Sequence, residues 1–275
     1  MNKQLVIFIV IIVFVVVKGF MIEPNSLTAT KYLIQDRRLT GLKVAFVSDL
    51  HYQKTDFKKL DKLTKTIRKE NPNIILIGGD IVKNTNKNNI ININLLSQKI
   101  KQLQLPTFAV LGETDLKVDG EKIAQDLTFN GIRVLNNSNA RIIANNQYID
   151  IIGLNNAKPQ NQEIDLAYDR TSIPRILIMH NPDSYFDIMD ETDLILAGHT
   201  LGGQVNFPLA GPIFVKSKFG SEFASGLIKK TSNPMVISKG VGTSGIPFRF
   251  NCKPEIVIVE FVSYDPDKDS KKSKK

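Results

Sequence analysis

Short apolar runs rich in β-branched residues recur along this chain and constrain its fold more than any other feature. Segments with apolar residues at helical spacing separate the first runs, a pattern typical of a buried α/β sheet. The second half has strands in closer succession, including a hairpin signalled by Asn145-Asn146. The predicted strands are 44–48, 74–77, 107–111, 141–144, 148–152, 175–179, 193–197, 235–238 and 256–261, and the predicted helices are 60–70 and 95–103. We therefore expect an α/β fold in which helices flank a two-sheet core.

The composition fits one globular domain and excludes several classes of protein. The chain has 275 residues, of which 42% are hydrophobic and 23% charged, enough for a sizeable core. Its one cysteine, Cys252, excludes an internal disulfide. The net charge of +9 comes from scattered lysines without an aromatic and basic pattern, so no nucleic-acid partner is expected.

An apolar run at the N-terminus predicts a membrane anchor. The run extends from Leu5 to Val17 and continues to Ile22 past Lys18, which approaches the length of a spanning helix. No small-x-small cleavage site follows it, which argues against a removable signal peptide. We expect an anchor over 1–22, a connecting segment over 23–41, the globular domain over 42–262 and a basic disordered tail over 263–275.

The distribution of basic residues around this run bears on its orientation. Lys3 precedes the run, whereas Lys31, Arg37 and Arg38 follow it. The positive-inside rule therefore favours a cytoplasmic location for the globular domain.

Polar side chains of metal-binding type follow five of the predicted strands. The carboxyl ends of strands in an open α/β sheet meet at one rim, where ligands bind. All three histidines of the chain belong to this set, which chance alone does not readily explain. Carboxylates and imidazoles together suit Mn, Fe, Zn or Co, and Asp80 is placed to bridge two ions. The predicted ligands are Asp49, His51, Asp80, Glu113, His180 and His199.

The order of the motifs resembles the calcineurin-like metallophosphoesterases. The matching elements are Asp49-x-His51, Gly79-Asp80, Gly112-x-x-Asp115, His180, Gly198-His199-Thr200-x-Gly202-Gly203-Gln204 and the run 240–251. Within that family the chain is similar to the membrane-anchored bacterial group that includes UDP-2,3-diacylglucosamine pyrophosphatases, enzymes of lipid A biosynthesis.

The resemblance implies a four-layer αββα sandwich and a hydrolase of phosphate ester or pyrophosphate bonds that uses one or two divalent ions. By position, Asp49 and His51 would bind the first metal, Asp80 would bridge, and His180 and His199 would bind the second. These five residues are the expected catalytic set. The resemblance also implies a single-pass protein of the bacterial inner membrane with a phosphorylated or lipid-linked substrate.

Three residues depart from the family motifs. Leu201 stands where the family has a histidine ligand of the first metal, so the affinity of that site should fall. Glu113 replaces a neutral asparagine ligand and would complete the second site. Thr114 replaces a histidine that contacts the phosphoryl group or protonates the leaving group, and loss of a general acid costs about 10²–10⁴-fold in rate.

These departures leave alternatives open. A hydrolase for substrates with good leaving groups accounts for the retained ligands. The altered ligands also fit a descendant that binds metal or a phosphate ligand without turnover. A scaffold without metal has no physical use for the ligand set. Arg249 fits either a phosphate contact or a structural role.

Overall fold

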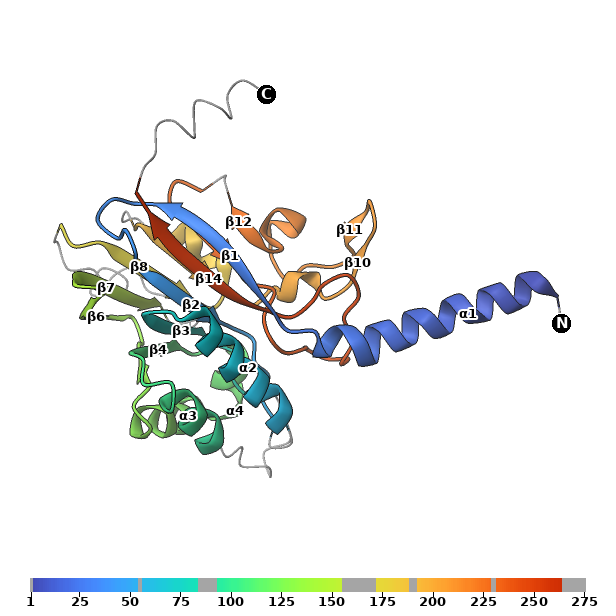
Figure 1. Cartoon of the computed structure of the whole chain (residues 1–275), viewed down its shortest axis with the longest axis horizontal. Helices are drawn as coiled ribbons and strands as arrows, with labels where there is room; N and C mark the ends of the chain where they lie inside the picture. The colour runs from blue at the N-terminus through green and yellow to red at the C-terminus, as the bar shows by residue number, and fades with distance from the viewer. Residues whose placement is uncertain are drawn as a thin grey trace, which may run out of the picture.

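Two six-stranded β-sheets form the core in the computed structural model, which describes residues 2–53, 56–83, 93–154, 172–187, 192–228 and 231–263 (Figure 1). All neighbours in the first sheet are parallel except β14 and β2. Its order is β1 (Thr28–Gln35), β14 (Glu255–Val262), β2 (Lys43–Val47), β3 (Ile74–Gly78), β4 (Thr107–Val110) and β5 (Arg133–Val134).

The second sheet is parallel at its centre and antiparallel at both edges. Its order is β12 (Gly226–Ile228), β13 (Met235–Ile237), β9 (Leu194–Ala197), β8 (Arg175–Met179), β7 (Gln147–Leu154) and β6 (Ser138–Ala144). The turn between β6 and β7 has positive φ at both Asn145 and Asn146, which confirms the predicted hairpin.

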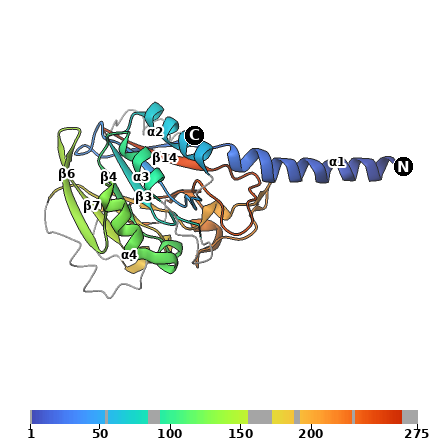
Figure 2. The ribbon, with the colours of Figure 1, turned by 90° about the horizontal axis from the view of Figure 1, so that it is seen from below.

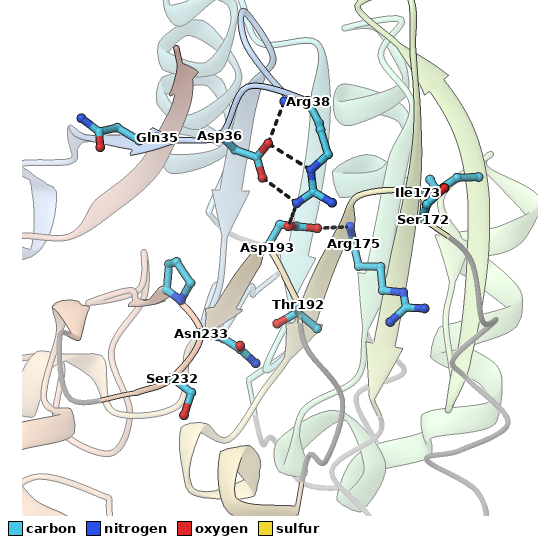
Figure 3. Close-up of a pocket in the computed structure, with 11 residues that line it drawn as sticks. Gln35, Asp36, Arg38, Ser172, Ile173, Arg175, Thr192, Asp193, Ser232 and Asn233 are labelled. Carbon is cyan, nitrogen blue, oxygen red and sulfur yellow. Dashed lines mark hydrogen bonds and ion pairs between the residues drawn. The ribbon is translucent and has the colours of Figure 1, made fainter. Parts of the chain in front are cut away.

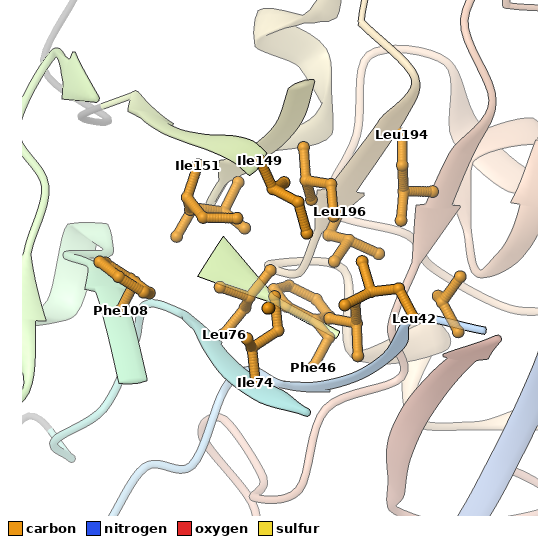
Figure 4. Packing of buried hydrophobic residues seen from close by; sticks show 14 of the residues in the cluster. Leu42, Phe46, Ile74, Leu76, Phe108, Ile149, Ile151, Leu194 and Leu196 are labelled. Carbon is orange, nitrogen blue, oxygen red and sulfur yellow. The ribbon is translucent and has the colours of Figure 1, made fainter. Parts of the chain in front are cut away.

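Side chains of the first sheet alternate between two cores. In β2, Val44 and Phe46 point into the space between the sheets, whereas Ala45 and Val47 point toward the helices. Figure 4 shows the inter-sheet core, in which Phe46 packs beside residues of both sheets. The burial of both faces explains the continuous apolar runs of these strands.

Three helices cover the outer face of the first sheet (Figures 1 and 2). They are α2 (Phe57–Glu70), α3 (Asn94–Lys101) and α4 (Glu113–Phe129). Leu60, Leu63 and Ile67 form the buried stripe of α2, as their helical spacing predicts. In α4 the backbone of Asp119 is not helical, so the helix is kinked there.

Short 3₁₀ turns cover the outer face of the second sheet within the described residues. Phe223 of η5 (Gly220–Phe223) and Tyr185 of η3 (Pro182–Asp187) pack there against the strands. The structure thus describes one helical layer, two sheets and these turns. A fourth, helical layer stays a prediction.

The N-terminal helix α1 (Lys3–Val17) projects away from the rest of the molecule (Figures 1 and 2). It buries none of its residues, and the turns η1 (Lys18–Ile22) and η2 (Glu23–Asn25) join it to β1. By length and composition, the helical segment Lys3–Asn25 is long and apolar enough to cross a membrane.

Two features differ from the sequence-based expectation. The segment 23–41, expected only to connect, contains β1, which pairs in parallel with β14 along its whole length. The helix α4 was not predicted, because its Gly120 and its kink at Asp119 obscure the helical pattern. The domain boundaries stay a prediction, and the tail beyond 263 lies outside the described residues.

Candidate metal centre

The predicted ligands stand at the carboxyl ends of strands, and several have an unusual backbone. Asp49 and His51 follow β2, and Asp80 follows β3. Their φ angles are 50°, 43° and 48°, and φ is 71° for His199 after β9. Left-handed backbone in residues other than glycine costs free energy and clusters at functional sites.

Asp49, His51 and Asp80 form a buried cluster. One ligand atom of each residue lies within 4.8 Å of the others. The Nε2 atom of His51 is 3.8 Å from Oδ2 of Asp80. Burial lowers the pKa of His51 to about 4, so its imidazole is neutral at pH 7, the form that binds metals.

His180 and His199 adjoin this cluster from the second sheet. His180 Nδ1 is 2.7 Å from the carbonyl oxygen of Gly78, so Nδ1 donates and Nε2 faces the cluster. That Nε2 atom is 3.5 Å from Oδ2 of Asp80 and 3.2 Å from Nδ1 of His199. Burial alone would lower the pKa of His180, but the carboxylates of Asp80 and Asp49 raise it to about 9.

Asp80 is the centre of the arrangement. Thr114 donates its backbone N–H to Oδ1 and its hydroxyl to Oδ2, both at 2.8 Å. Although burial opposes ionisation, the neighbouring imidazoles of His180 and His51 hold the pKa of Asp80 below its usual range. A Cβ at Gly112 would lie 2.3 Å from Oδ1, so only glycine fits beside this carboxylate.

Glu113 is partly exposed and pairs with Lys117 on α4, although its charge also acts on His199. It is the first residue of α4, its side chain is 42% exposed, and its carboxylate lies 3.4 Å from Nζ of Lys117. Its predicted role as a ligand therefore requires another rotamer and stays a proposal.

Leu201 places an apolar side chain beside Asp49. It begins the short turn η4 (Leu201–Gly203), is buried and has φ 53°. A Cβ at Gly240 would lie 2.7 Å from Cβ of Asp49 and 3.1 Å from Cδ2 of Leu201. The site thus has a leucine against its wall where the family motif has a ligand.

Asp115 and Arg249 have structural roles in the loops around the site. The buried carboxylate of Asp115 accepts backbone N–H bonds from Ile81, Val82 and Gly112, which ties the loop after Asp80 to the start of α4. The fully buried guanidinium of Arg249 donates to backbone carbonyls around the site, so its role is structural. These carbonyls belong to Leu201, Lys239, Gly240, Gly242 and Cys252.

The donor atoms fit a divalent metal. Oδ1 of Asp49 and Nε2 of His51 are buried and have no hydrogen-bond partner among the described residues. Buried polar atoms without a partner are costly, and a cation between them would satisfy both. Oxygen and imidazole donors suit the transition metals named above.

A cavity of about 460 Å³ begins at His51. Its other wall comes from the end of the N-terminal helix, with Phe20 and Pro24. Lys58, Lys59 and Lys83 also line it.

A separate cavity of about 540 Å³ lies at the opposite, amino ends of β8, β9 and β13 (Figure 3). Arg38 bridges Asp36 and Asp193 there, and the Arg175 backbone N–H donates to Asp193 at 2.7 Å. The carboxylates of Asp36 and Asp193 are thus paired with Arg38 and with the Arg175 backbone. None of the predicted ligands lines this cavity.

Comparisons with known proteins agree with this centre. The family model for calcineurin-like phosphoesterases matches residues 42–203. Phosphodiesterase YaeI of Escherichia coli (strain K12) is 32% identical over 229 residues, covering 80% of this chain and 82% of that protein. An uncharacterized metallophosphoesterase of Aquifex aeolicus (strain VF5) is 28% identical over 257 residues, covering 86% of this chain and 93% of that protein.

The 5′-nucleotidase precursor from Thermus thermophilus is a more distant structural match. Its TM-score is 0.47 at 13% identity, with 73% of this chain and 49% of that chain covered. The assignment therefore depends on the sequence matches and on the cluster of aspartates and histidines at the sheet rim. Because the family model spans more than half of the chain and includes every one of these ligands, the chain belongs to the calcineurin-like phosphoesterase family and is a hydrolase of phosphoesters.

Proposed function

We propose that the chain hydrolyses a phosphodiester or pyrophosphate bond with divalent metal held by the six predicted ligands. The observation that carries the proposal is the pair of buried, unpartnered donor atoms, Asp49 Oδ1 and His51 Nε2, beside Asp80. Asp49, His51 and Asp80 form the first site. Asp80, His180, His199 and a rotated Glu113 form the second.

The bound metal supplies Lewis-acid polarisation of the phosphoryl oxygen and a lowered pKa for a water molecule. The protein residues hold and orient this centre. His180 is fixed by its bond to Gly78, and Asp80 is fixed by Thr114.

The position of Thr114 favours a substrate with a good leaving group. Its hydroxyl is engaged with Asp80, and a threonine hydroxyl is too weak an acid to protonate a leaving alkoxide. A phosphoanhydride needs little protonation, because its leaving phosphate is already a weak base. A pyrophosphate bond is therefore the favoured target.

The cavity at His51 supports an anionic, membrane-associated substrate. Burial lowers the pKa of Lys59, and its amine has no ion pair with any of the described residues. An incoming phosphate would pair with Lys59 and Lys83. Phe20 and Pro24 place the far wall of this cavity at the end of the predicted anchor. A lipid-linked nucleotide such as UDP-2,3-diacylglucosamine is the narrower form of the proposal.

The cellular setting is part of the same proposal. We place the chain in the bacterial inner membrane by a single span, with the catalytic domain on the cytoplasmic side, as the basic residues after the run favour. We also propose that a fourth layer, made of helices, covers the second sheet.

Metal content and turnover of the full chain in detergent micelles test the central claim. The assay is hydrolysis of bis-p-nitrophenyl phosphate in Mn²⁺, whose leaving group needs no acid. Asp80→Asn should lower the rate by at least about 100-fold and reduce bound metal. The matched control is Asp61→Asn, which removes a carboxylate from a surface ion pair with Lys99.

Bound metal without turnover in the parent protein would favour the non-catalytic descendant over the hydrolase. Equal rates for Asp80→Asn and Asp61→Asn would overturn the proposed centre.

A further inference from the structure

A small hairpin near the N-terminal helix exposes a continuous apolar tip. Strands β10 (Asn206–Phe207) and β11 (Gly211–Pro212) form it. We define the apolar tip as Phe207, Leu209, Ile213 and Phe214, all of which are exposed. Soluble surfaces rarely gather so many large apolar side chains in one place, so this tip calls for a partner.

The backbone of the tip adds to this argument. Leu209 is fully exposed and has φ 69°, a conformation that favours glycine or asparagine. Neither burial nor backbone geometry accounts for a leucine at this position, whereas contact with an apolar phase does.

The hairpin lies beside the exit of the N-terminal helix. Figures 1 and 2 both place β10 and β11 at the end of the molecule from which α1 projects. A chain of contacts joins the two elements. The Phe207 and Phe250 ring centroids are 6.2 Å apart, and Nζ of Lys18 lies 4.4 Å from the Phe250 centroid. Lys18 also donates to Asn251 at 2.5 Å.

Basic residues flank the apolar tip. Lys216 and Lys218 follow it and are exposed, and Lys18 directly follows the last residue of α1. Apolar side chains bordered by lysines match the acyl region and the anionic headgroups of a bilayer.

We propose that the apolar tip inserts into the lipid bilayer that α1 crosses, so that the catalytic domain has two membrane contacts. This inference depends on the proposal that α1 spans a membrane. The partner is the lipid surface itself. Lys216 donates to Oγ of Ser244 at 3.1 Å, and the adjacent Thr243 lines the cavity that begins at His51, so the insertion would hold the metal centre near the headgroups.

The absence of tryptophan from the sequence makes a direct test possible. Each single-substitution variant of the full chain therefore has one tryptophan, whose emission reports on one position. The variants are Leu209→Trp in the tip, Phe8→Trp in α1, and Ile143→Trp in β6. Ile143 is a matched control, because it is 61% exposed in β6, and β6 lies at the end of the molecule opposite to α1 (Figures 1 and 2).

The proteins are reconstituted in vesicles of phosphatidylcholine and phosphatidylglycerol, with and without dibrominated acyl chains. We expect the brominated lipid to quench Leu209→Trp and Phe8→Trp strongly and to leave Ile143→Trp unchanged. Aqueous iodide should quench only Ile143→Trp.

Other outcomes separate the two proposals. If Phe8→Trp is quenched by brominated lipid but Leu209→Trp behaves like Ile143→Trp, the tip inference is wrong and the anchor stands. If Phe8→Trp is not quenched, both fail. A Leu209→Trp signal shielded from iodide but not quenched by brominated lipid would overturn the lipid assignment in favour of a protein partner.

Discussion

Thr114 holds both carboxylate oxygens of Asp80, one with its backbone N–H and one with its hydroxyl, each at 2.8 Å. The same Oδ2 atom that accepts the hydroxyl faces His180 and His51. Thr114 therefore fixes the proposed bridging ligand, although the family motif has a histidine at its position.

Restoring a histidine at this position should change leaving-group preference. Thr114→His should raise the rate on a dinucleoside phosphate, whose leaving group is an alkoxide, by about 10²-fold relative to the rate on bis-p-nitrophenyl phosphate. Steady-state assays on both substrates measure the ratio. Thr114→Val, which replaces the hydroxyl with a methyl group, should leave the ratio unchanged. An unchanged ratio in Thr114→His would contradict the proposal that the missing histidine sets the leaving-group preference.

The leucine beside Asp49 should limit metal occupancy. Leu201→His would add an imidazole next to the first site, and bound metal per chain should rise, as measured by elemental analysis after dialysis against Mn²⁺. Leu201→Met keeps the volume and apolar character and should leave the occupancy as it is. The interpretation fails if both variants bind the same amount of metal.

Metal binding should depend on pH through His180. Its pKa of about 9 means that the metal-free imidazole is protonated at pH 7 and must release that proton before Nε2 can bind metal. Affinity should therefore rise by about tenfold per pH unit from pH 7 toward 9 and level off above it. Calorimetry in buffers of different ionisation enthalpy measures the protons released.

His51 is the internal control for the measurement of proton release. Because burial lowers its pKa to about 4, it should release no proton at pH 7. A metal affinity that stays constant between pH 7 and 9 would show that metal binding does not displace a proton from His180.

The lysines of the cavity should affect binding of an anionic substrate. Lys59→Met should raise KM for UDP-2,3-diacylglucosamine in mixed micelles by about 10-fold or more, since hydrogen bonds to charged groups contribute about 1.5–3 kcal/mol. Lys65→Met, on the exposed side of the same helix, is the control. An equal KM in both variants would remove Lys59 from the substrate site.

The strands that carry the ligands were predictable, because burial on both faces leaves an unbroken apolar run such as the one in β3. The clustering of Asp49, His51 and Asp80 also followed from their strand-end positions. The strand β1 was not predicted, because it lies at a sheet edge and alternates polar with apolar residues in a segment that follows the helix.

Side-chain direction was the part that the sequence could not determine. Glu113 has the chemistry of a ligand, but its carboxylate pairs with Lys117 on α4. The sequence does not determine which rotamer such a partly exposed side chain adopts. The role of Arg249 depends on carbonyl groups from two separate connections, one after β9 and one between β13 and β14, which only the folded chain brings together.

The ladder between β1 and β14 has a mechanical consequence. The N-terminal helix joins the domain through β1, which pairs in parallel with β14 from Thr28 and Glu255 to Gln35 and Val262. Figure 1 shows β1 running away from the helix, so a pull on the helix acts along the strand. Such tension would load the whole ladder in shear, and the hydrogen bonds would resist together instead of opening one at a time.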